Sequence, residues 1–348
     1  MSQPRRQPTM RDVARVAGVS QRTVSNVVSN YRHVTPETRA KVRAAIAELG
    51  YRPNVAAQRL REGRTGIIAL AVPSLTWPYF SDIAHLIQVA AQRAGATLMV
   101  VETEGNAAFE RKVLQGFRTN LIDGLILSPI ELSAAELDAM DLGIPVVLLG
   151  ERIKEVGMLH LSMDNVQGAR EMAAHVHDMG ARSFVLLGST HTMMTSSAGA
   201  LRLRGFTEEL AARGVPSTAW REISVSPWTQ EGGYEVMLAE LAGGPRPDAV
   251  IGMNDLLAFG TLRACAELGI SVPGDMLVSG WDDISLGRYS VPTITTVSPD
   301  KAAIAQRAVD GLLGQVEAGA QHATDVTVAH SLVIRESTMV AGSDQVPQ

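Results

Sequence analysis

The sequence predicts a chain in two parts: a small all-α head of the helix-turn-helix type, followed by a much larger α/β body. The first 50 residues contain three helix-start signals, and from Gly66 onward apolar runs of strand length alternate with helical patterns. Continuous apolar strands between helices are typical of parallel sheets that are covered on both faces. Because about ten such units exceed one sheet, we expect two doubly wound parallel-sheet subdomains in the body.

Three short helices are expected in the head, and each is preceded by a residue that can cap it. The caps are Thr9, Ser20 and Thr35. Asp12 lies three residues after the first cap, Pro36 suits the first position of the third helix, and Gly18 and Gly50 end helices. Apolar residues at helical spacing mark the inward faces, namely Val13, Val16, Ala17, Val24, Val27, Val28, Val42, Ile46 and Leu49. Two helices joined by a tight turn and braced by a third make a helix-turn-helix.

Charge separates the head from the body. Residues 1–64 carry 13 Lys and Arg against four Asp and Glu, whereas the remaining residues carry 18 against 32. A basic, patterned head on an acidic body indicates that the head binds nucleic acid. The second helix leaves polar groups outward for this purpose: Gln21, Arg22, Ser25, Asn26 and Ser29. Such groups lie at the end of the helix where base edges of a major groove would be.

The bulk composition excludes several other classes of protein. Cys265 is the single cysteine, which excludes an internal disulfide and fits a reducing cytoplasm. The N-terminus lacks the apolar core of a secretion signal, and no apolar run reaches the length of a membrane span. No phosphate loop, GxGxxG, HExxH or metal-spaced cysteine cluster occurs. We therefore expect no catalytic residues, no metal and no cofactor, and the chain is not expected to be an enzyme.

The body offers a ligand site where its strands end. Helices are expected near 80–94, 107–119, 134–142, 166–179, 199–213, 230–242 and 255–268, with apolar strands between them. Ligands of doubly wound folds bind beyond the carboxyl ends of the strands. The segments that follow strands include "PSLTWPYF", "SP" at 128–129, "MNDLLAFG" and "GWDD". Aromatic faces beside planar hydrogen-bonding groups suit a polar ring or a polyol.

The head, from "MRDVARVAGVSQRTVSNVVSN" to "YRPNVAAQRL", closely resembles the DNA-binding head of the LacI/GalR (lactose-repressor/galactose-repressor) family. The resemblance implies that a hinge helix within 51–65, capped by Asn54, folds on DNA against the hinge of a partner chain. Leu60 stands where the family inserts a leucine into the minor groove. The DNA-binding residues implied are Thr9, Ser20, Gln21, Arg22, Thr23, Ser25, Asn26, Asn54, Ala57 and Leu60. Many members have arginine where this chain has Asn26, so the preferred half-site is expected to differ.

The body resembles the periplasmic-binding-protein-like regulatory domain of the same family, most specifically in "PDAVIGMNDLLAFGTLRACAELGISVPGDMLVSGWDD". The implied domains are a head over 1–50, a hinge over 51–65, an effector-binding and dimerisation domain over 66–340 and a tail over 341–348. One subdomain would comprise 66–162 and 295–325, and the other 163–292 and 328–340. Three crossings between them are expected, near 162–165, 291–295 and 325–330.

The same resemblance implies an effector site in the cleft between the subdomains. Its residues would be Trp77, Tyr79, Phe80, Ser128, Arg202, Trp228, Asn254 and Asp282. Structural alternatives stay open for several of them. The aromatic residues at 77–80 could pack at the subdomain interface, and Arg202 could simply pair with Asp282 across the cleft. Asn254 and Asp255 could cap the helix at 255, and Asp283 is expected to be a helix cap rather than a ligand contact.

These features predict a bacterial transcription regulator, a homodimer on a pseudo-palindromic double-stranded operator. We expect a repressor that is released when a sugar or sugar acid binds in the cleft. The alternatives are a regulator that a purine or nucleoside corepressor activates, and a sugar-binding protein without a regulatory role. The C-terminal "STMVAGSDQVPQ" lacks a leucine heptad, which favours a dimer over a tetramer.

Overall fold

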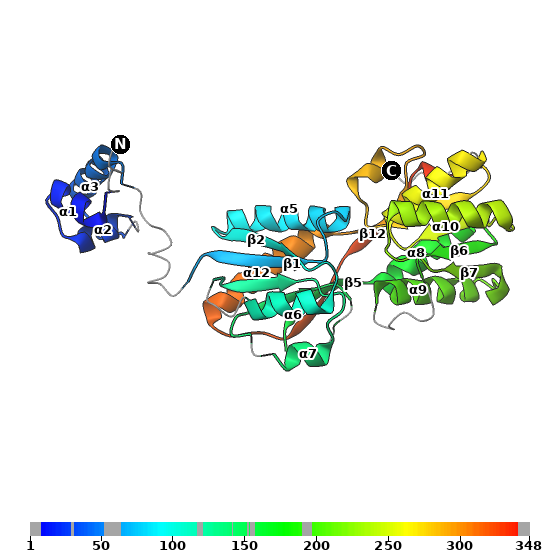
Figure 1. Ribbon diagram of the computed structural model, residues 1–348, viewed down its shortest axis with the longest axis horizontal. Coiled ribbons are helices and arrows are strands. Elements are labelled where there is room, and N and C mark those ends of the chain that lie inside the picture. The colour runs from blue at the N-terminus through cyan, green and yellow to red at the C-terminus, as the bar shows by residue number, and fades with distance from the viewer. Residues whose placement is uncertain are drawn as a thin grey trace, which may run out of the picture. The chain divides into compact units, whose positions relative to one another are not determined.

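The structure is a computed structural model that describes residues 8–28, 31–51, 64–116, 121–140, 142–151, 153, 157–189 and 197–339. The chain divides into two compact units, Met1–Thr65 and Gly66–Gln348. Figure 1 shows a small helical unit and a larger unit in which helices surround two sheets. Each unit has its own hydrophobic core.

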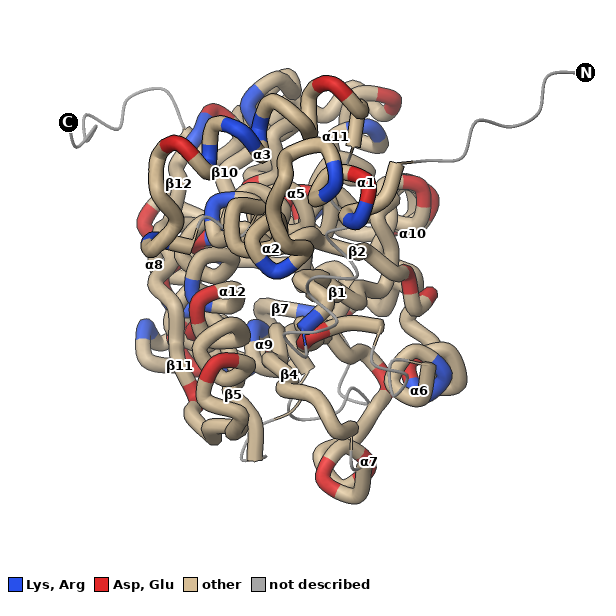
Figure 2. Tube along the Cα trace, turned by 90° about the vertical axis from the view of Figure 1, so that its left-hand side faces the viewer, with Lys and Arg blue, Asp and Glu red and all other residues tan. Residues whose placement is uncertain are grey.

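The head consists of α1 (Met10–Ala17), α2 (Gln21–Val28) and α3 (Pro36–Leu49). Its core contains Val13, Val24 and Val42, which are fully buried. Val16 was expected to face inward but is 40% exposed, because Ala14 occupies the buried position one turn before Gly18. Lys and Arg residues lie on all three helices of the head, whereas the charged residues of α7 (Ala134–Asp138) in the body are both acidic (Figure 2).

The first sheet of the body is parallel throughout the described strands and has the order β11-β5-β4-β3-β1-β2. Its strands are β1 (Ile67–Val72), β2 (Thr97–Glu102), β3 (Gly124–Leu127), β4 (Val146–Leu149), β5 (Leu159–Met163) and β11 (Thr324–Val328). α5 (Pro78–Arg93) and α12 (Lys301–Ala318) pack on one face. α6 (Ala107–Gly116) and α7 (Ala134–Asp138) pack on the other.

The second sheet has the order β12-β10-β9-β8-β6-β7, and among its described strands only β12 runs antiparallel to its neighbour. Its strands are β6 (Phe184–Leu187), β7 (Trp220–Ile223), β8 (Ala249–Gly252), β9 (Leu277–Trp281), β10 (Thr295–Pro299) and β12 (His330–Val333). The helices of this subdomain are α8 (Asn165–Asp178), α9 (Ala198–Ala212), α10 (Gln230–Gly243) and α11 (Asp255–Leu268). Short 3₁₀ turns lie at Ser217–Ala219, Ser285–Arg288 and Glu336–Thr338.

The chain passes between the sheets after β5, after β10 and after β11. The expected second crossing near 291–295 is wrong, and so is the assignment of 295–299 to the first subdomain. β10 pairs in parallel with β9 through Thr295–Ser279 and Val297–Trp281, so the chain stays in the second sheet until Pro299. The crossing therefore lies at Asp300, directly before α12.

Two expected helices differ in extent. The helix expected near 134–142 is a single short turn, Ala134–Asp138, which Ser133 caps through a capping box with Glu136. Of the helix expected at 107–119, Ala107–Gly116 is helical, and 117–120 lie outside the described residues. The fold brings the carboxyl ends of the parallel strands of each sheet to one edge, where most of the expected effector residues lie.

Candidate functional site

The start of α2 is held by two hydroxyl groups. The Thr23 backbone N–H donates to Ser20 Oγ at 3.1 Å, and the two hydroxyl oxygens are 2.9 Å apart. The buried Val24 and Val27 fix the opposite face of the helix in the head core. Gln21 and Arg22 are therefore exposed on the first turn of a rigidly anchored helix. This is the geometry in which a recognition helix presents side chains to base edges.

The other expected DNA-binding residues have more varied surroundings. Thr9 and Asp12 form a capping box in which Thr9 Oγ1 donates to Asp12 Oδ2 at 2.7 Å, so this hydroxyl group first serves α1. Ser25 and Asn26 are half-buried on α2. Asn54, Ala57 and Leu60 lie outside the described residues. The DNA contacts of all these residues stay predictions.

The body brings the expected effector residues to the carboxyl ends of strands in both sheets. Trp77 precedes α5, Tyr79 and Phe80 lie in its first turn, and Ser128 follows β3. Trp228, Asn254 and Asp282 follow β7, β8 and β9, and Arg202 lies on α9. The three aromatic rings at the start of α5 form a cluster, with centroids of Trp77 and Phe80 5.9 Å apart and those of Tyr79 and Phe80 5.1 Å apart. Tyr79 and Phe80 also pack against the core of the first subdomain.

Arg202 is the buried cation of this site. Its Nε donates to Asn165 Oδ1 at 2.7 Å, and its Nη1 donates to the backbone carbonyl of Met253. The guanidinium carbon lies 4.2 Å from the ring centroid of Trp281 and 6.0 Å from that of Trp228. These distances fit cation–π contacts, which favour a desolvated guanidinium group.

Asp282 faces Arg202 from the end of β9, with 3.9 Å between Arg202 Nη2 and Asp282 Oδ1. The alternative in which Arg202 pairs with Asp282 is thus right about the partner, but both residues belong to the second-sheet subdomain, so the pair does not span the cleft. The pKa of Asp282 is raised to about 6, mainly because burial desolvates the carboxylate. The positive charges of Arg202 and Lys301 oppose this rise, and the negative charges of Glu151 and Asp82 add to it. The Asp282 carboxylate is thus a poorly solvated acceptor beside Arg202.

Tyr79 brings a hydroxyl group to the same place from the first subdomain. Burial raises the pKa of the Tyr79 phenol, and the negative charges of Glu151 and Asp282 raise it further. The phenol therefore keeps its proton at neutral pH and can donate a hydrogen bond. Burial lowers the pKa of Arg202, and the surrounding acidic groups Asp282 and Glu151 oppose this. The four side chains form one electrostatically coupled centre.

Asn254 and Trp228 have structural partners. Asn254 caps α11 by accepting from the Leu257 N–H at 2.9 Å, and its amide donates to the Trp228 carbonyl at 3.2 Å. The capping alternative for Asn254 is thereby confirmed. The Trp228 indole N–H donates to the Gly188 carbonyl at 3.0 Å. What Trp228 can still offer a ligand is the face of its ring.

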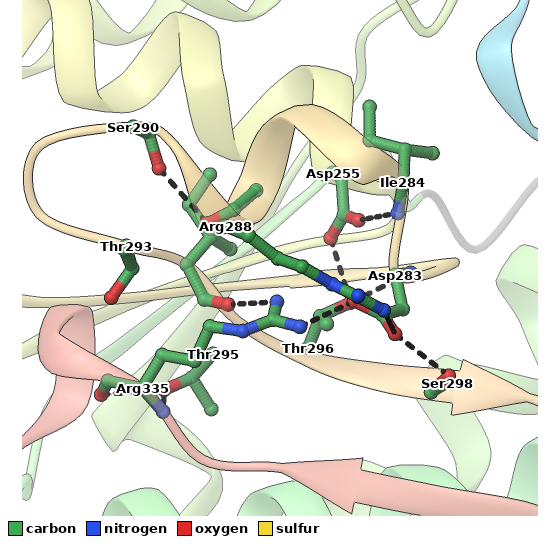
Figure 3. A network of polar contacts seen from close by, with 12 residues as sticks. Asp255, Asp283, Ile284, Arg288, Ser290, Thr293, Thr295, Thr296, Ser298 and Arg335 are labelled. Atoms are coloured by element: carbon green, nitrogen blue, oxygen red, sulfur yellow. Dashed lines mark hydrogen bonds and ion pairs between the residues drawn. The ribbon is translucent and has the colours of Figure 1, made fainter.

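The backbone at Asp282 and Asp283 is strained and held by a polar network. Both residues have positive φ, 102° and 47°, a conformation that non-glycine residues rarely adopt. Asp283 accepts from Arg335 Nη2 at 2.6 Å and from Ser298 Oγ at 3.1 Å, and Arg288 approaches at 3.4 Å (Figure 3). The expectation that Asp283 caps a helix is wrong, because its carboxylate oxygens bind Arg335, Ser298 and Arg288 instead of helix N–H groups. The network fixes the turn that presents Asp282.

Asp255 supports the same turn from inside the subdomain. It accepts from the Ile284 N–H at 2.8 Å and from Thr296 Oγ1 at 2.7 Å (Figure 3). Burial raises the pKa of Asp255 to about 8, and the charge of Asp282 adds to this. Burial therefore favours the protonated form of Asp255, and its carboxyl group serves as a buried hydrogen-bonding group rather than as a cap.

The sequence patterns did not indicate four residues that lie at or near the expected site, namely Glu151, Asn165, Asp255 and Arg335. Glu151 could have been found, because it follows the apolar strand "IPVVLLG" directly, in the same way that Ser128 follows its own strand.

Among the described residues, no group of His, Cys, Asp and Glu could hold a metal ion. No helix in the described part of the chain is long and apolar enough to cross a membrane.

A helix-turn-helix on its own core, with a two-subdomain α/β body that gathers polar side chains at its strand ends, defines a class: DNA-binding regulators controlled by a small molecule. Residues 9–54 match the family model of bacterial regulatory proteins of the lacI family, and residues 173–338 match the periplasmic binding protein-like domain. A similar protein is the HTH-type transcriptional repressor PurR of Mannheimia succiniciproducens. It is 31% identical over 336 residues, which cover 94% of this chain and 98% of that protein.

Solved structures agree with this class. The Lac repressor dimer bound to operator and the anti-inducer ONPF has a TM-score of 0.84 at 30% identity, over 96% of this chain and 100% of that one. The transcriptional regulator CelR–cellobiose complex has a TM-score of 0.68 at 27% identity, over 95% and 99% of the two chains. The chain belongs to the LacI family. It is a DNA-binding transcriptional repressor of that family and not an enzyme, and such repressors act as dimers on operator DNA under the control of small effectors.

Proposed function

We propose that the chain represses genes for the use of a carbohydrate or sugar acid, and that this compound releases the repressor by binding between the subdomains. One observation carries the proposal: the Arg202–Asp282 pair is buried beside the Trp228 and Trp281 rings at the strand ends. A carboxylate acceptor next to a buried cation, beside the ring face of Trp228, suits the hydroxyl groups and the apolar ring face of a sugar. The related CelR structure is a cellobiose complex, which supports this choice.

A purine or nucleoside that acts as corepressor is the second candidate. It is favoured by the name of the relatives, PurR, at 28–31% identity over 94% of this chain. A purine ring would stack on Trp228 and use Asp282 and Tyr79 as acceptor and donor. A sugar-binding protein without a regulatory role leaves the basic helix-turn-helix head without a function, so we do not retain it. The proposed place of action is the bacterial cytoplasm, on a pseudo-palindromic operator bound by a homodimer.

The effector is tested by a thermal-shift screen of the full-length protein against sugars, sugar acids, polyols, nucleosides and purines. A ligand that binds the native state raises the midpoint of unfolding by mass action. Each hit is then added to the protein on DNA selected from a random pool. A sugar or sugar acid that weakens DNA binding supports the proposal. A nucleoside or purine that strengthens it supports the second candidate and overturns the first.

Two variants separate the DNA site from the effector site. Arg22→Ala in the head should change base preference at one position of each half-site and leave the thermal shift by the effector unchanged. Asp282→Asn in the body should reduce the thermal shift and leave DNA binding without effector intact. A uniform loss of affinity for every DNA sequence in Arg22→Ala would mean that this side chain contacts phosphate only.

A third variant tests the hinge. Leu60→Ala should weaken operator binding and DNA bending with little effect on effector affinity.

A further inference from the structure

Lys301 joins the two subdomains of the body through a side-chain hydrogen bond. It is the first residue of α12, which packs with α5 on the first sheet. Its Nζ donates to the backbone carbonyl of Asp283 at 3.1 Å, and Asp283 follows β9 of the second sheet. The same Nζ lies 2.6 Å from Asp82 Oδ2 on α5. One ammonium group is therefore anchored in the first subdomain and binds the backbone of the second.

The position of Lys301 is unfavourable for the helix that carries it. The N-terminus of a helix bears a partial positive charge, which disfavours a cation in the first turn. Asp300 already caps α12, since its carboxylate accepts from the Ala303 N–H at 2.8 Å. The Lys301 side chain is nevertheless only 13% exposed. The helix itself does not explain this lysine, whereas the two partners outside the helix do.

The carbonyl that Lys301 binds belongs to a turn that the second subdomain holds firmly. The Asp283 carboxylate accepts from Arg335 Nη2 at 2.6 Å, and the N–H of the next residue, Ile284, donates to Asp255 at 2.8 Å. On the other side, α5 and α12 are fixed by the hydrophobic core of the first subdomain. Because both ends of the contact lie in separately packed elements, the Lys301–Asp283 hydrogen bond is kept only while the subdomains stay near their present angle.

Close packing does not fill this part of the junction between the subdomains. A cavity of about 680 Å³ lies beside the contact. Its described walls come from both subdomains and from the crossing segments, and they include Asp82, Asp283, Asp300, Lys301 and Ala329. The angle on this side of the junction therefore depends on polar contacts rather than on apolar packing.

We infer that Lys301 is a clamp that keeps the two subdomains near their present angle, and that Asp82 is a positioning residue that directs the ammonium group to the Asp283 carbonyl. The inference goes beyond the proposed function and does not depend on the identity of the effector. The clamped carbonyl belongs to the residue after Asp282, so the clamp also sets how that acceptor faces the first subdomain. A hydrogen bond to a charged group changes an equilibrium by roughly tenfold.

The distance between two spin labels tests the clamp on the full-length protein. Cys265, the single cysteine, is buried and is first removed by Cys265→Ala. The labels are attached after Ala135→Cys on α7 of the first subdomain and Ala211→Cys on α9 of the second, which are both exposed positions. Labelled chains are refolded with an excess of unlabelled chains, so that a labelled dimer reports on one chain. Pulsed electron–electron double resonance then measures the distribution of the distance.

Lys301→Met removes the charge and the donor of the clamp and keeps an unbranched side chain. We expect the population outside the wild-type distance peak to increase about tenfold. The control is Lys112→Met, the same change at an exposed lysine of α6, which should leave the distribution as it is in the wild-type protein. A wild-type distribution in Lys301→Met overturns the inference.

Asp82→Asn tests the positioning role. It keeps Lys301 and removes its anionic partner, so we expect a smaller change of the distribution in the same direction. In the double variant the change should be no larger than in Lys301→Met alone, because both substitutions act through one contact. Additive changes would mean that Asp82 acts independently and would overturn its positioning role. If Lys301→Met does not fold, an unchanged distribution in Asp82→Asn overturns the inference.

Binding to DNA selected from a random pool, measured on the same variants without added ligand, separates this inference from the proposed function. A changed distance with an unchanged affinity for DNA supports the clamp and counts against control of DNA binding by the angle between the subdomains. An unchanged distance overturns the clamp and leaves the proposed function standing.

Discussion

Replacing Arg335 by alanine removes the main partner of Asp283. Arg335 Nη2 lies 2.6 Å from Asp283 Oδ1, and the two side chains are 12% and 9% exposed. The Arg335 Nη1 also donates to the Ile294 carbonyl at 2.8 Å. The change therefore removes one donor from a buried carboxylate and one from a backbone carbonyl (Figure 3).

The expected cost follows from burial. Removing one partner of a buried ion pair typically costs about 3–5 kcal/mol, because the other charge stays buried. Asp283 retains Ser298 at 3.1 Å and Arg288 at 3.4 Å, so we expect the lower end, about 3 kcal/mol. Arg288→Ala is a matched control on the same carboxylate. Its side chain is 62% exposed, and for such a pair the loss should stay below about 1 kcal/mol.

Urea unfolding monitored by tryptophan fluorescence measures both variants, since all four tryptophans lie in the body. A shift of the midpoint at constant slope reports stability. Burial alone would raise the pKa of Asp283, but the hydrogen bond and charge of Arg335 lower it below its usual value. The stabilisation is therefore present above the unfolded pKa and is lost as the pH falls through the folded pKa. The difference in the free energy of unfolding between the wild-type protein and Arg335→Ala should therefore become smaller at acidic pH. Equal losses in the two variants would refute this account of the turn.

Two further substitutions test the packing and the protonation of the second subdomain. Gly205→Ala places a Cβ atom against the backbone carbonyl of Val166 in α8, so it should cost at least about 1–3 kcal/mol in the same unfolding assay. Gly243→Ala, with nothing within 4 Å, is its control and should be nearly neutral. Asp255 has its pKa raised from 3.8 to about 8, so stability should fall as the pH rises between these values. Asp255→Asn should flatten that slope in pH-dependent unfolding, and an unchanged slope would contradict a protonated Asp255.

Local signals explain why the head was predictable. The Thr9–Asp12 capping box and the Thr35 cap with Pro36 use contacts within four residues, and the structure has both. The apolar strands of the body were equally clear. The second crossing between the subdomains was predicted at the wrong place, because the sequence pattern of Thr295–Pro299 indicates a strand but does not indicate which sheet the strand joins. That choice depends on pairing with β9 and β12.

The sequence predicted which residues lie at the candidate site, but not which hydrogen bonds those residues make. The rule that ligands lie beyond strand ends located Ser128, Asp282 and Asn254, and it applies to Glu151 as well. The rule says nothing about which donors are free. Arg202 was expected to hold the ligand, but its donors go to Asn165 and Met253, which are 37 and 51 positions away in the sequence. Such pairings are consequences of tertiary structure.

The turn at Asp282 and Asp283 is held by side chains from both subdomains, so a ligand that binds Asp282 would be coupled to their arrangement. Lys301, the first residue of α12 in the first subdomain, donates to the Asp283 carbonyl at 3.1 Å and is oriented by Asp82 of α5. Arg335 ties the same turn to the second subdomain. A ligand shifts a conformational equilibrium only through contacts that differ between the two states. Because Asp282 precedes a carbonyl that is held from the other subdomain, a ligand that moves Asp282 must also change that contact.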